Sequence, residues 1–143
     1  MPAYSFKKRF AGSVRNGRKR QTIRKPRKYP TKPGDTLYLY TALRTKWAKK
    51  LREVTCKSVH RIYIFFNKPY IHISPCWNPN PDGKIVLVKG AIISDMYKLN
   101  EFARADGFKN WEDMKAFWIA EYGVKKGNRK VILRKFEGEL IKW

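Results

Sequence analysis

The pattern of apolar and polar positions changes from a strand period to a helical period along the chain. Residues 4–9 alternate like a strand, and a short helix is expected at 11–16, ending at Gly17 because a helix end often needs a positive φ. Branched and aromatic residues then favour further strands. These expected strands cover residues 19–25, 36–43, 51–66 (a β-rich stretch), 70–74 and 84–88.

The helical period begins after Ser94. Ser94 is placed to cap a helix whose first turn holds Asp95, a charge that suits the helix dipole. Apolar residues then recur at helical spacing as far as Gly107. Asn110 is placed to cap a second helix, which Gly123 is expected to end.

Together these elements predict an α+β fold with a short N-terminal helix and a late helical pair. Residues 130–143 alternate again and predict a closing strand, while the polar, proline-rich stretches 25–34 and 75–83 are expected to be loops. So many short, mostly antiparallel strands favour a small closed or nearly closed β-barrel. The length suits one domain, so residues 1–143 are interpreted as a single domain.

The net charge of the chain indicates what class of partner it binds. Lys and Arg number 33 against 11 Asp and Glu, giving +22, and a chain that is 43% hydrophobic carries this charge on a folded surface. Such a charge favours a polyanionic partner. Residues 1–34 hold twelve basic side chains and no acidic one, and residues 1–68 hold twenty against two. The polyanion surface is therefore expected in the first half, chiefly in residues 1–34.

Several classes of protein are excluded by the lack of long apolar segments. The longest apolar run, residues 62–66, is too short to span a bilayer, and the first ten residues lack the apolar core of a secretory signal. No strongly amphipathic basic helix is found, so no membrane partner is expected. Two cysteines make no disulfide framework, and a reducing cytoplasm is the expected compartment.

A motif at residues 17–24 supplies candidate chemistry. Its sequence, GRKRQTIR, fits the pattern G-x-K-x-x-x-x-R. An expected short helix precedes it, and a turn at 33–35 follows it. Four later segments follow in order: 93–95 (ISD), 101–103 (EFA), 106–108 (DGF) and 111–114 (WEDM). From about Tyr4 to Trp143 this order resembles the ASCH domain family, relatives of the PUA RNA-binding domains.

The resemblance implies a PUA-like β-barrel with a cleft lined by the motif strand, and an RNA-binding role. One branch of the family hydrolyses the amide of N(4)-acetylcytidine, and another has been associated with RNA cleavage. The deacetylating branch uses a Lys, a Thr and a Glu, which fall on Lys19, on Thr22 and near Asp106. This chain departs from the branch at Asp106, which is one methylene shorter than Glu, and that departure counts against catalysis.

The residue types of the motif allow two interpretations. Lys19 and Thr22 are three apart, so on a strand they point to opposite faces unless a bulge or the strand's start near Gly17 brings them together. As catalytic residues, Thr22 would be the nucleophile, Lys19 the base with a pKa lowered by burial, and Asp106 its orienting or proton-shuttling partner. As binding residues, Lys19 would contact a phosphate and Thr22 would only favour the strand.

Nucleic-acid contacts are expected from the cations and exposed rings of this chain. Arg24 presents a planar donor fork that suits a phosphate or a base edge, and its alternative is a solvated surface arginine. Tyr29 and Trp77 stand in polar stretches, where a ring can stack on a base. The predicted binding set is Arg18, Lys19, Arg20, Arg24, Lys25, Arg27, Lys28, Tyr29 and Trp77.

Two Cys and two His have a spacing that resembles a zinc site. In Cys56-x3-His60 and His72-x3-Cys76 the paired residues are four apart, which on a strand is about 13 Å, too far for both to hold one metal. A hairpin turning at 67–69 would place His60 opposite Cys76, which gives two ligands and not four. No metal and no cofactor is therefore expected.

The sequence therefore predicts an RNA-binding domain, with single-stranded DNA as an alternative polymer. A cleft at Lys19, Thr22 and Arg24 is expected to receive a base or nucleotide. The alternative is an enzyme that acts on N(4)-acetylcytidine or on RNA through Lys19, Thr22 and Asp106. A component docked on a large ribonucleoprotein is a third interpretation. A net charge of +22 far exceeds what a nucleoside hydrolase requires, so polymer binding is preferred.

Overall fold

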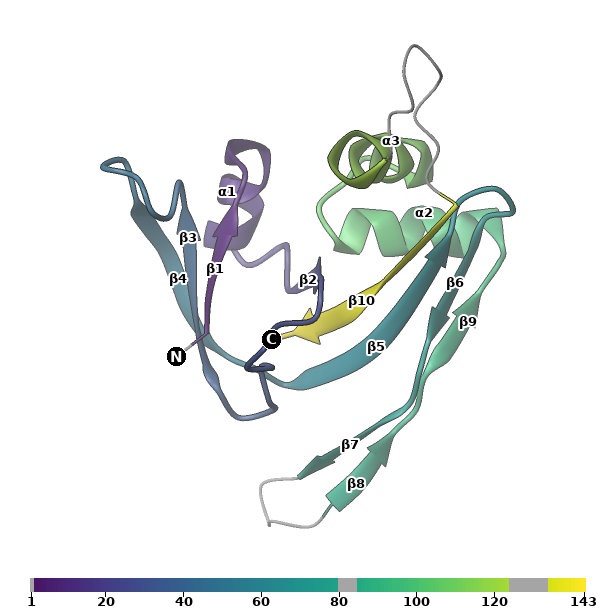
Figure 1. The fold of residues 1–143 in the computed structure, drawn as a ribbon, viewed down its shortest axis with the longest axis horizontal. Helices are drawn as coiled ribbons and strands as arrows, with labels where there is room; N and C mark the ends of the chain where they lie inside the picture. The colour runs from purple at the N-terminus through teal and green to yellow at the C-terminus, as the bar shows by residue number, and fades with distance from the viewer. Residues whose placement is uncertain (1, 80–84, 124–133) are drawn as a thin grey trace.

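The computed structural model describes residues 2–79, 85–123 and 134–143, which form a mixed α and β fold (Figure 1). The described helices are α1 (Lys8–Arg15), α2 (Met96–Ala105) and α3 (Trp111–Tyr122). The described strands are β1 (Ala3–Phe6), β2 (Gln21–Arg24), β3 (Thr36–Thr41), β4 (Lys49–Thr55), β5 (Ser58–Phe65), β6 (Tyr70–Ile73), β7 (Cys76–Pro79), β8 (Ile85–Val88), β9 (Ala91–Ile93) and β10 (Lys135–Lys142). The predicted α+β class, with a short N-terminal helix and a late helical pair, is confirmed.

The strands in this part of the chain form three sheets. A three-stranded sheet has the order β1-β3-β4, a five-stranded sheet has the order β2-β10-β5-β6-β9, and β7 pairs with β8 alone. β1 and β3 are parallel, and the other described pairs are antiparallel, as predicted. The long ladder between β5 and β10 forms the middle of the five-stranded sheet (Figure 1).

The described residues form no closed barrel, one of the two forms predicted, because the two larger sheets stay open. β1 and β2 are each an edge of their sheet, and no described ladder joins them. Arg24 of β2 instead reaches across this seam, where its Nη2 donates to the Ser5 carbonyl oxygen of β1 at 2.8 Å. Hydrogen-bonded strands lie about 4.8 Å apart. At this seam the Arg24 guanidinium packs against the rings of Tyr4 and Phe6, so side chains and not a backbone ladder connect β1 to β2.

Local capping explains where the helices begin and end. α2 begins after Asp95 and not after the predicted Ser94, because the Asp95 carboxylate accepts two N–H groups of the first turn at 2.6 and 3.3 Å. Asn110 caps α3 as predicted, accepting the N–H of Asp113 at 2.9 Å. Gly17 has the expected positive φ, +82°, just after α1.

The stretch 75–83, predicted to be a loop, contains a strand. Residues Cys76–Pro79 form β7 and pair with the branched residues of β8, while residues 80–83 lie outside the described part of the chain. The prolines suggested a break, but a proline at the end of a strand in a two-stranded ribbon leaves the ladder intact.

Other predicted elements are correct in type and differ in their ends. The expected strand at 19–25 is only Gln21–Arg24, and the β-rich stretch 51–66 divides into two strands around residues 56–57. The closing strand is β10, beginning at Lys135, and residues 130–133 of its predicted range lie outside the described residues.

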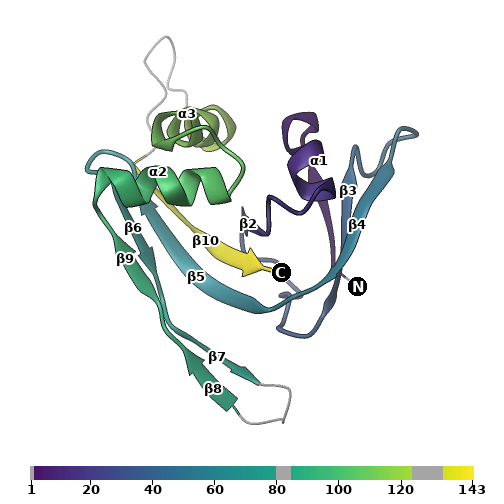
Figure 2. The same ribbon diagram turned by 180° about the vertical axis from the view of Figure 1, so that it is seen from behind.

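One apolar core joins the helices to the sheets. Figure 2 shows α2 and α3 over one end of the five-stranded sheet and α1 beside β3. Fully buried side chains come from α1 (Val14), β3 (Leu39), β5 (Ile64), α2 (Leu99) and α3 (Trp111). Burying each such side chain contributes about 1.5–3 kcal/mol, so the helices are fixed against the strands. Among the described residues, no helix combines the length and the apolar character needed to cross a bilayer.

Candidate functional site

Lys19 stands in the connection between α1 and β2. Gly17 ends the helix, and the backbone N–H of Lys19 then donates to the Ser13 carbonyl oxygen at 2.9 Å. β2 begins only at Gln21, so Lys19 lies before the strand and does not follow its alternation. Lys19 and Thr22 line the same cavity, and the strand begins at Gln21, later than the expected start near Gly17.

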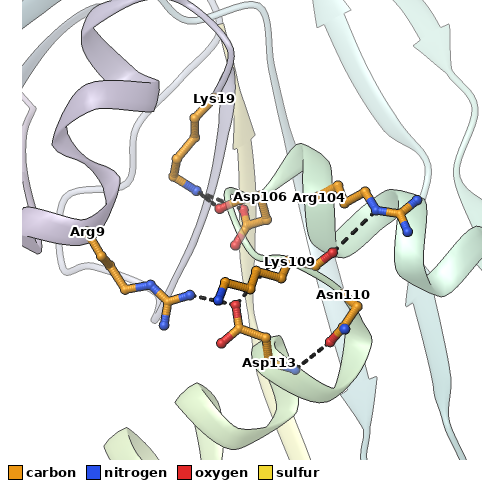
Figure 3. Close-up of polar contacts among 7 residues, drawn as sticks. All are labelled: Arg9, Lys19, Arg104, Asp106, Lys109, Asn110 and Asp113. Atoms are coloured by element: carbon orange, nitrogen blue, oxygen red, sulfur yellow. Dashed lines mark hydrogen bonds and ion pairs between the residues drawn. The ribbon is translucent and has the colours of Figure 1, made fainter.

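Lys19 forms a buried ion pair with Asp106, at the end of α2 (Figure 3). Its Nζ lies 3.2 Å from Asp106 Oδ1 and donates to the Asp106 backbone carbonyl oxygen. The two residues are only 3% and 4% exposed. Burial lowers the pKa of the Lys19 ammonium and raises the pKa of the Asp106 carboxyl, while the charge of each partner opposes the shift. Each charge therefore offsets part of the cost of burying the other.

The absence of a side chain at Gly107 lets Lys19 pack close to Asp106. Its φ of +96° lies in the region that favours glycine. A Cβ at Gly107 would lie 2.9 Å from Cδ1 of Phe10 and 3.2 Å from Cδ of Lys19. The Asp106–Gly107 step therefore supplies the carboxylate and also lets α1 and Lys19 approach the end of α2.

The ion pair forms part of the wall of an inner cavity of about 150 Å³ between β1, β2, α1 and α3. Most of the apolar wall is aromatic, and a set of charged and hydroxyl groups completes it. The aromatic residues are Phe6, Phe10, Phe108, Phe117, Trp118 and Tyr122, and the polar residues are Ser5, Lys7, Lys19, Thr22, Arg24, Asp106 and Glu121. The buried indole N–H of Trp118 has no hydrogen-bond partner in the described part of the chain, so this wall holds an unused donor.

Arg24 is fixed at the seam by two hydrogen bonds and two rings. Besides its bond to Ser5, its Nε donates to Thr22 Oγ1 at 3.2 Å. Its Cζ lies 4.9 Å from the ring centre of Phe6 and 5.5 Å from that of Tyr4. Burial lowers the pKa of Arg24, although a guanidinium stays charged at neutral pH. Thr22 therefore serves first as a hydrogen-bond acceptor that positions Arg24.

Two salt bridges hold α3 to the start of α1 beside the cavity. Lys7 pairs with Glu121, and Arg9 Nη2 lies 2.6 Å from Asp113 Oδ2. The Asp113 carboxylate accepts from the Arg9 guanidinium of α1 and from the backbone N–H of Lys109, which precedes α3 (Figure 3). Each cation around the inner cavity other than Arg24 thus has a carboxylate partner.

Two further hollows adjoin the inner cavity along the predicted basic segment. The second hollow, of about 390 Å³, shares Ser5 and Arg24 with the inner cavity, and the third, of about 450 Å³, shares Arg27 with the second. The second hollow is lined by Ala3, Tyr4, Ser5, Arg24, Lys25, Arg27, Leu43 and Arg44. The third is lined by Pro2, Arg27, Lys28, Tyr29, Pro30, Thr31 and Asp35. We call the three together the basic path.

Six predicted binding residues lie on the basic path, two line a separate hollow, and the side chain of the ninth lies outside what the structure describes. Lys19, Arg24, Lys25, Arg27, Lys28 and Tyr29 line it, and Tyr29 is 80% exposed. Arg18 and Arg20 instead line a separate hollow with Lys57 and Lys142, because they flank Lys19 and point away from the inner cavity. Trp77 lies on β7, and its side chain is outside the described part of the structure.

Two exposed residues of the loop after β3 were not predicted. Arg44 lines the second hollow, and its φ of +70° is unusual for a residue other than glycine. Trp47 is 73% exposed, and Lys46 Nζ lies 5.0 Å from its ring centre. The sequence offered only one indication, a tryptophan among cations between two strands, because the position of the loop beside β1 depends on long-range packing.

The four zinc-spaced residues divide as the hairpin geometry predicts. His60 Nε2 lies 3.6 Å from Cys76 Sγ, whereas His72 stacks on Tyr63. The Cys56 thiol donates to a backbone carbonyl, and burial raises its pKa to about 11, so it is a poor metal ligand at neutral pH. Within the described ranges, no group of three or more His, Cys, Asp or Glu residues is arranged to hold a metal ion.

Comparisons with known proteins gave no match. No protein-family model, curated protein or solved structure is similar enough to this chain to assign it to a family. The buried ion pair, the aromatic cavity and the basic path are therefore the observations from which a function can be inferred.

Proposed function

We propose that this protein binds single-stranded nucleic acid, and RNA in particular, along the basic path. The observation that carries this proposal is a run of five cations without carboxylate partners among the described residues: Arg24, Lys25, Arg27, Lys28 and Arg44. Like charges that lie side by side repel each other. Binding of a polyanion relieves this repulsion, which favours the complex. Three hollows in a row fit an extended chain of phosphates better than a single small anion.

The inner cavity is proposed to receive one base. A cavity of about 150 Å³ is large enough for a single six-membered ring. Aromatic walls and a guanidinium are the groups on which unstacked bases pack in single-strand binding proteins. The charged groups of Lys19 and Asp106 would meet the polar edge of the base.

The resemblance to the ASCH family supports the same role. The motif residues Lys19, Thr22 and Arg24 line one cavity with Asp106, the residue near which the family's acidic member falls. We extend the proposal to the fold: a PUA-like domain whose barrel stays open at the seam between β1 and β2.

A second candidate function is hydrolysis at the inner cavity, of N(4)-acetylcytidine or of RNA. Two observations favour it: Lys19, Thr22 and Asp106 share the cavity, and burial lowers the pKa of Lys19 as a general base requires. Against it, Lys19 contacts Asp106 and the Thr22 hydroxyl accepts from Arg24, so the base and the nucleophile have other partners. Binding is therefore the preferred function.

Fluorescence anisotropy of a labelled single-stranded RNA tests the binding function. The variant Lys25→Gln, Arg27→Gln, Lys28→Gln removes three charges from the basic path. The matched control, Lys68→Gln, Lys89→Gln, Lys98→Gln, removes three exposed charges elsewhere. The path variant should bind about tenfold more weakly or worse, whereas the control should stay within about threefold of the wild type. Equal losses in both variants would show that net charge, and not the path, attracts the RNA.

Turnover assays with N(4)-acetylcytidine and with RNA test the hydrolase. No turnover is expected, since Asp106 replaces Glu and the lysine has a competing partner. Turnover by the wild type that disappears in Thr22→Val, with RNA affinity retained, would establish the enzyme instead.

A further inference from the structure

Within the described part of the chain, the cations of the second hollow lack the carboxylate partners that the other cations around the inner cavity have. Around the inner cavity, Lys7, Arg9 and Lys19 each pair with a carboxylate. The second hollow is lined by four cations, Arg24, Lys25, Arg27 and Arg44, and by no acidic residue. None of the four forms an ion pair with a carboxylate of the described residues. The second hollow therefore carries positive charge that no side chain of its lining neutralises.

Two of these cations pack against the same aromatic ring. The Cζ atoms of Arg24 and Arg27 lie 5.5 and 5.0 Å from the ring centre of the same residue, Tyr4. The charge of Arg27 contributes to the lowered pKa of Arg24, after the larger effect of burial. The Tyr4 ring is buried, and its hydroxyl is hydrogen-bonded to Thr31, which holds the ring in place. Two guanidinium groups that pack on one ring offer planar donors that suit an oxyanion.

Arg44 reaches this hollow from a different part of the chain. It belongs to the loop after β3, and its backbone holds the left-handed conformation at φ +70°. A residue other than glycine adopts that conformation at some cost, and such strain concentrates at functional sites. Here the strained residue contributes a fourth cation to the hollow.

We propose that the second hollow is a phosphate site, and that it acts together with the inner cavity to hold one phosphorylated nucleotide. Ser5 and Arg24 line both spaces, so a ring in the cavity and a phosphate in the hollow are neighbours, as they are within a nucleotide. The ligand class is thus a nucleotide with its phosphate, either free or within a polynucleotide, and not a neutral nucleoside. This inference rests on the proposed binding of a base in the inner cavity.

Calorimetry with cytidine, cytidine 5′-monophosphate, cytidine 3′-monophosphate and a short single-stranded RNA tests the assignment. At least one monophosphate should bind about tenfold more tightly than cytidine. Arg44→Gln should reduce that preference to about threefold or less, without changing the affinity for cytidine. The matched control Lys46→Gln lies in the same exposed loop but lines none of the three hollows, and it should keep the preference.

The outcomes separate this proposal from the proposed function. Equal affinity for cytidine and both monophosphates, with RNA still bound, overturns the phosphate site and leaves RNA binding standing. A loss of cytidine and monophosphate affinity by the same factor in Arg44→Gln also overturns it. A strong preference for a monophosphate, with no RNA binding, supports the phosphate site and refutes the polynucleotide path. Thermal melting of both variants verifies that each is folded.

Discussion

The Lys19 ammonium lies 3.2 Å from the Asp106 carboxylate, although the two are 87 positions apart in the chain. This pair ties the α1–β2 connection to the end of α2, next to the inner cavity. Removing one member of a buried ion pair leaves the other charge without a partner in a poorly solvated place. The pair therefore fixes the geometry of the proposed base site as well as its charge.

Lys19→Met and Asp106→Asn should each lower the free energy of unfolding by about 3–5 kcal/mol, because each leaves a buried polar group without its partner. The double variant should be less destabilised than the sum of the two single variants, since it leaves no unpaired charge. Urea denaturation of the four proteins measures this coupling. Strictly additive losses would mean that the two side chains do not interact.

Gly107→Ala should destabilise the protein by about 1–3 kcal/mol. The positive φ alone costs about 1–2 kcal/mol for a residue with a Cβ, and the new methyl group would press on Phe10 and Lys19. The control is Gly12→Ala in α1, where a Cβ meets nothing within 4 Å, and it should be neutral or stabilising. Equal effects of the two substitutions in urea denaturation would contradict the close packing at Gly107.

Asp113→Asn should weaken the contact between α1 and α3 in a pH-dependent way. The backbone N–H of Lys109 and the Arg9 guanidinium hold the pKa of Asp113 below its ordinary value of 3.8. A lowered carboxyl pKa contributes stability that is present above 3.8 and lost as the pH falls through the pKa of the folded protein. The variant should therefore be about 1 kcal/mol less stable at pH 7.

The same comparison at lower pH provides the control for Asp113. The stability difference between Asp113→Asn and the wild type should shrink as the pH falls below 3.8. A difference that stays constant down to pH 3 would show that packing, and not the carboxylate charge, accounts for the loss.

The features that follow local rules were predictable from the sequence. The Asn110 cap, the positive φ at Gly17 and the period change after Ser94 depend on residues within one or two turns. The motif allowed Lys19 and Thr22 to point to opposite faces of a strand or to share one cleft. They share one cavity, because the strand begins only at Gln21 and Lys19 precedes it. Their roles in binding or catalysis stay predictions.

The features that the sequence did not predict depend on long-range packing. The open seam exists because the Arg24 side chain, and not a backbone ladder, connects β2 to β1. Arg44 enters the second hollow through a left-handed backbone that neither its residue type nor its neighbours favour. Arg18 and Arg20 carry the same charge as Arg24 but line a different hollow, which charge counting along the chain cannot show.

The salt dependence of RNA affinity tests the central claim most directly. Each phosphate contact to a single strand contributes about 0.7 to the slope of log affinity against log salt concentration. The five unpaired cations of the basic path predict a slope of magnitude about 3.5 for the wild type. The variant Lys25→Gln, Arg27→Gln, Lys28→Gln should reduce it to about 1.5. A slope near zero, or one that this variant leaves unchanged, would contradict binding of a phosphate backbone along the basic path.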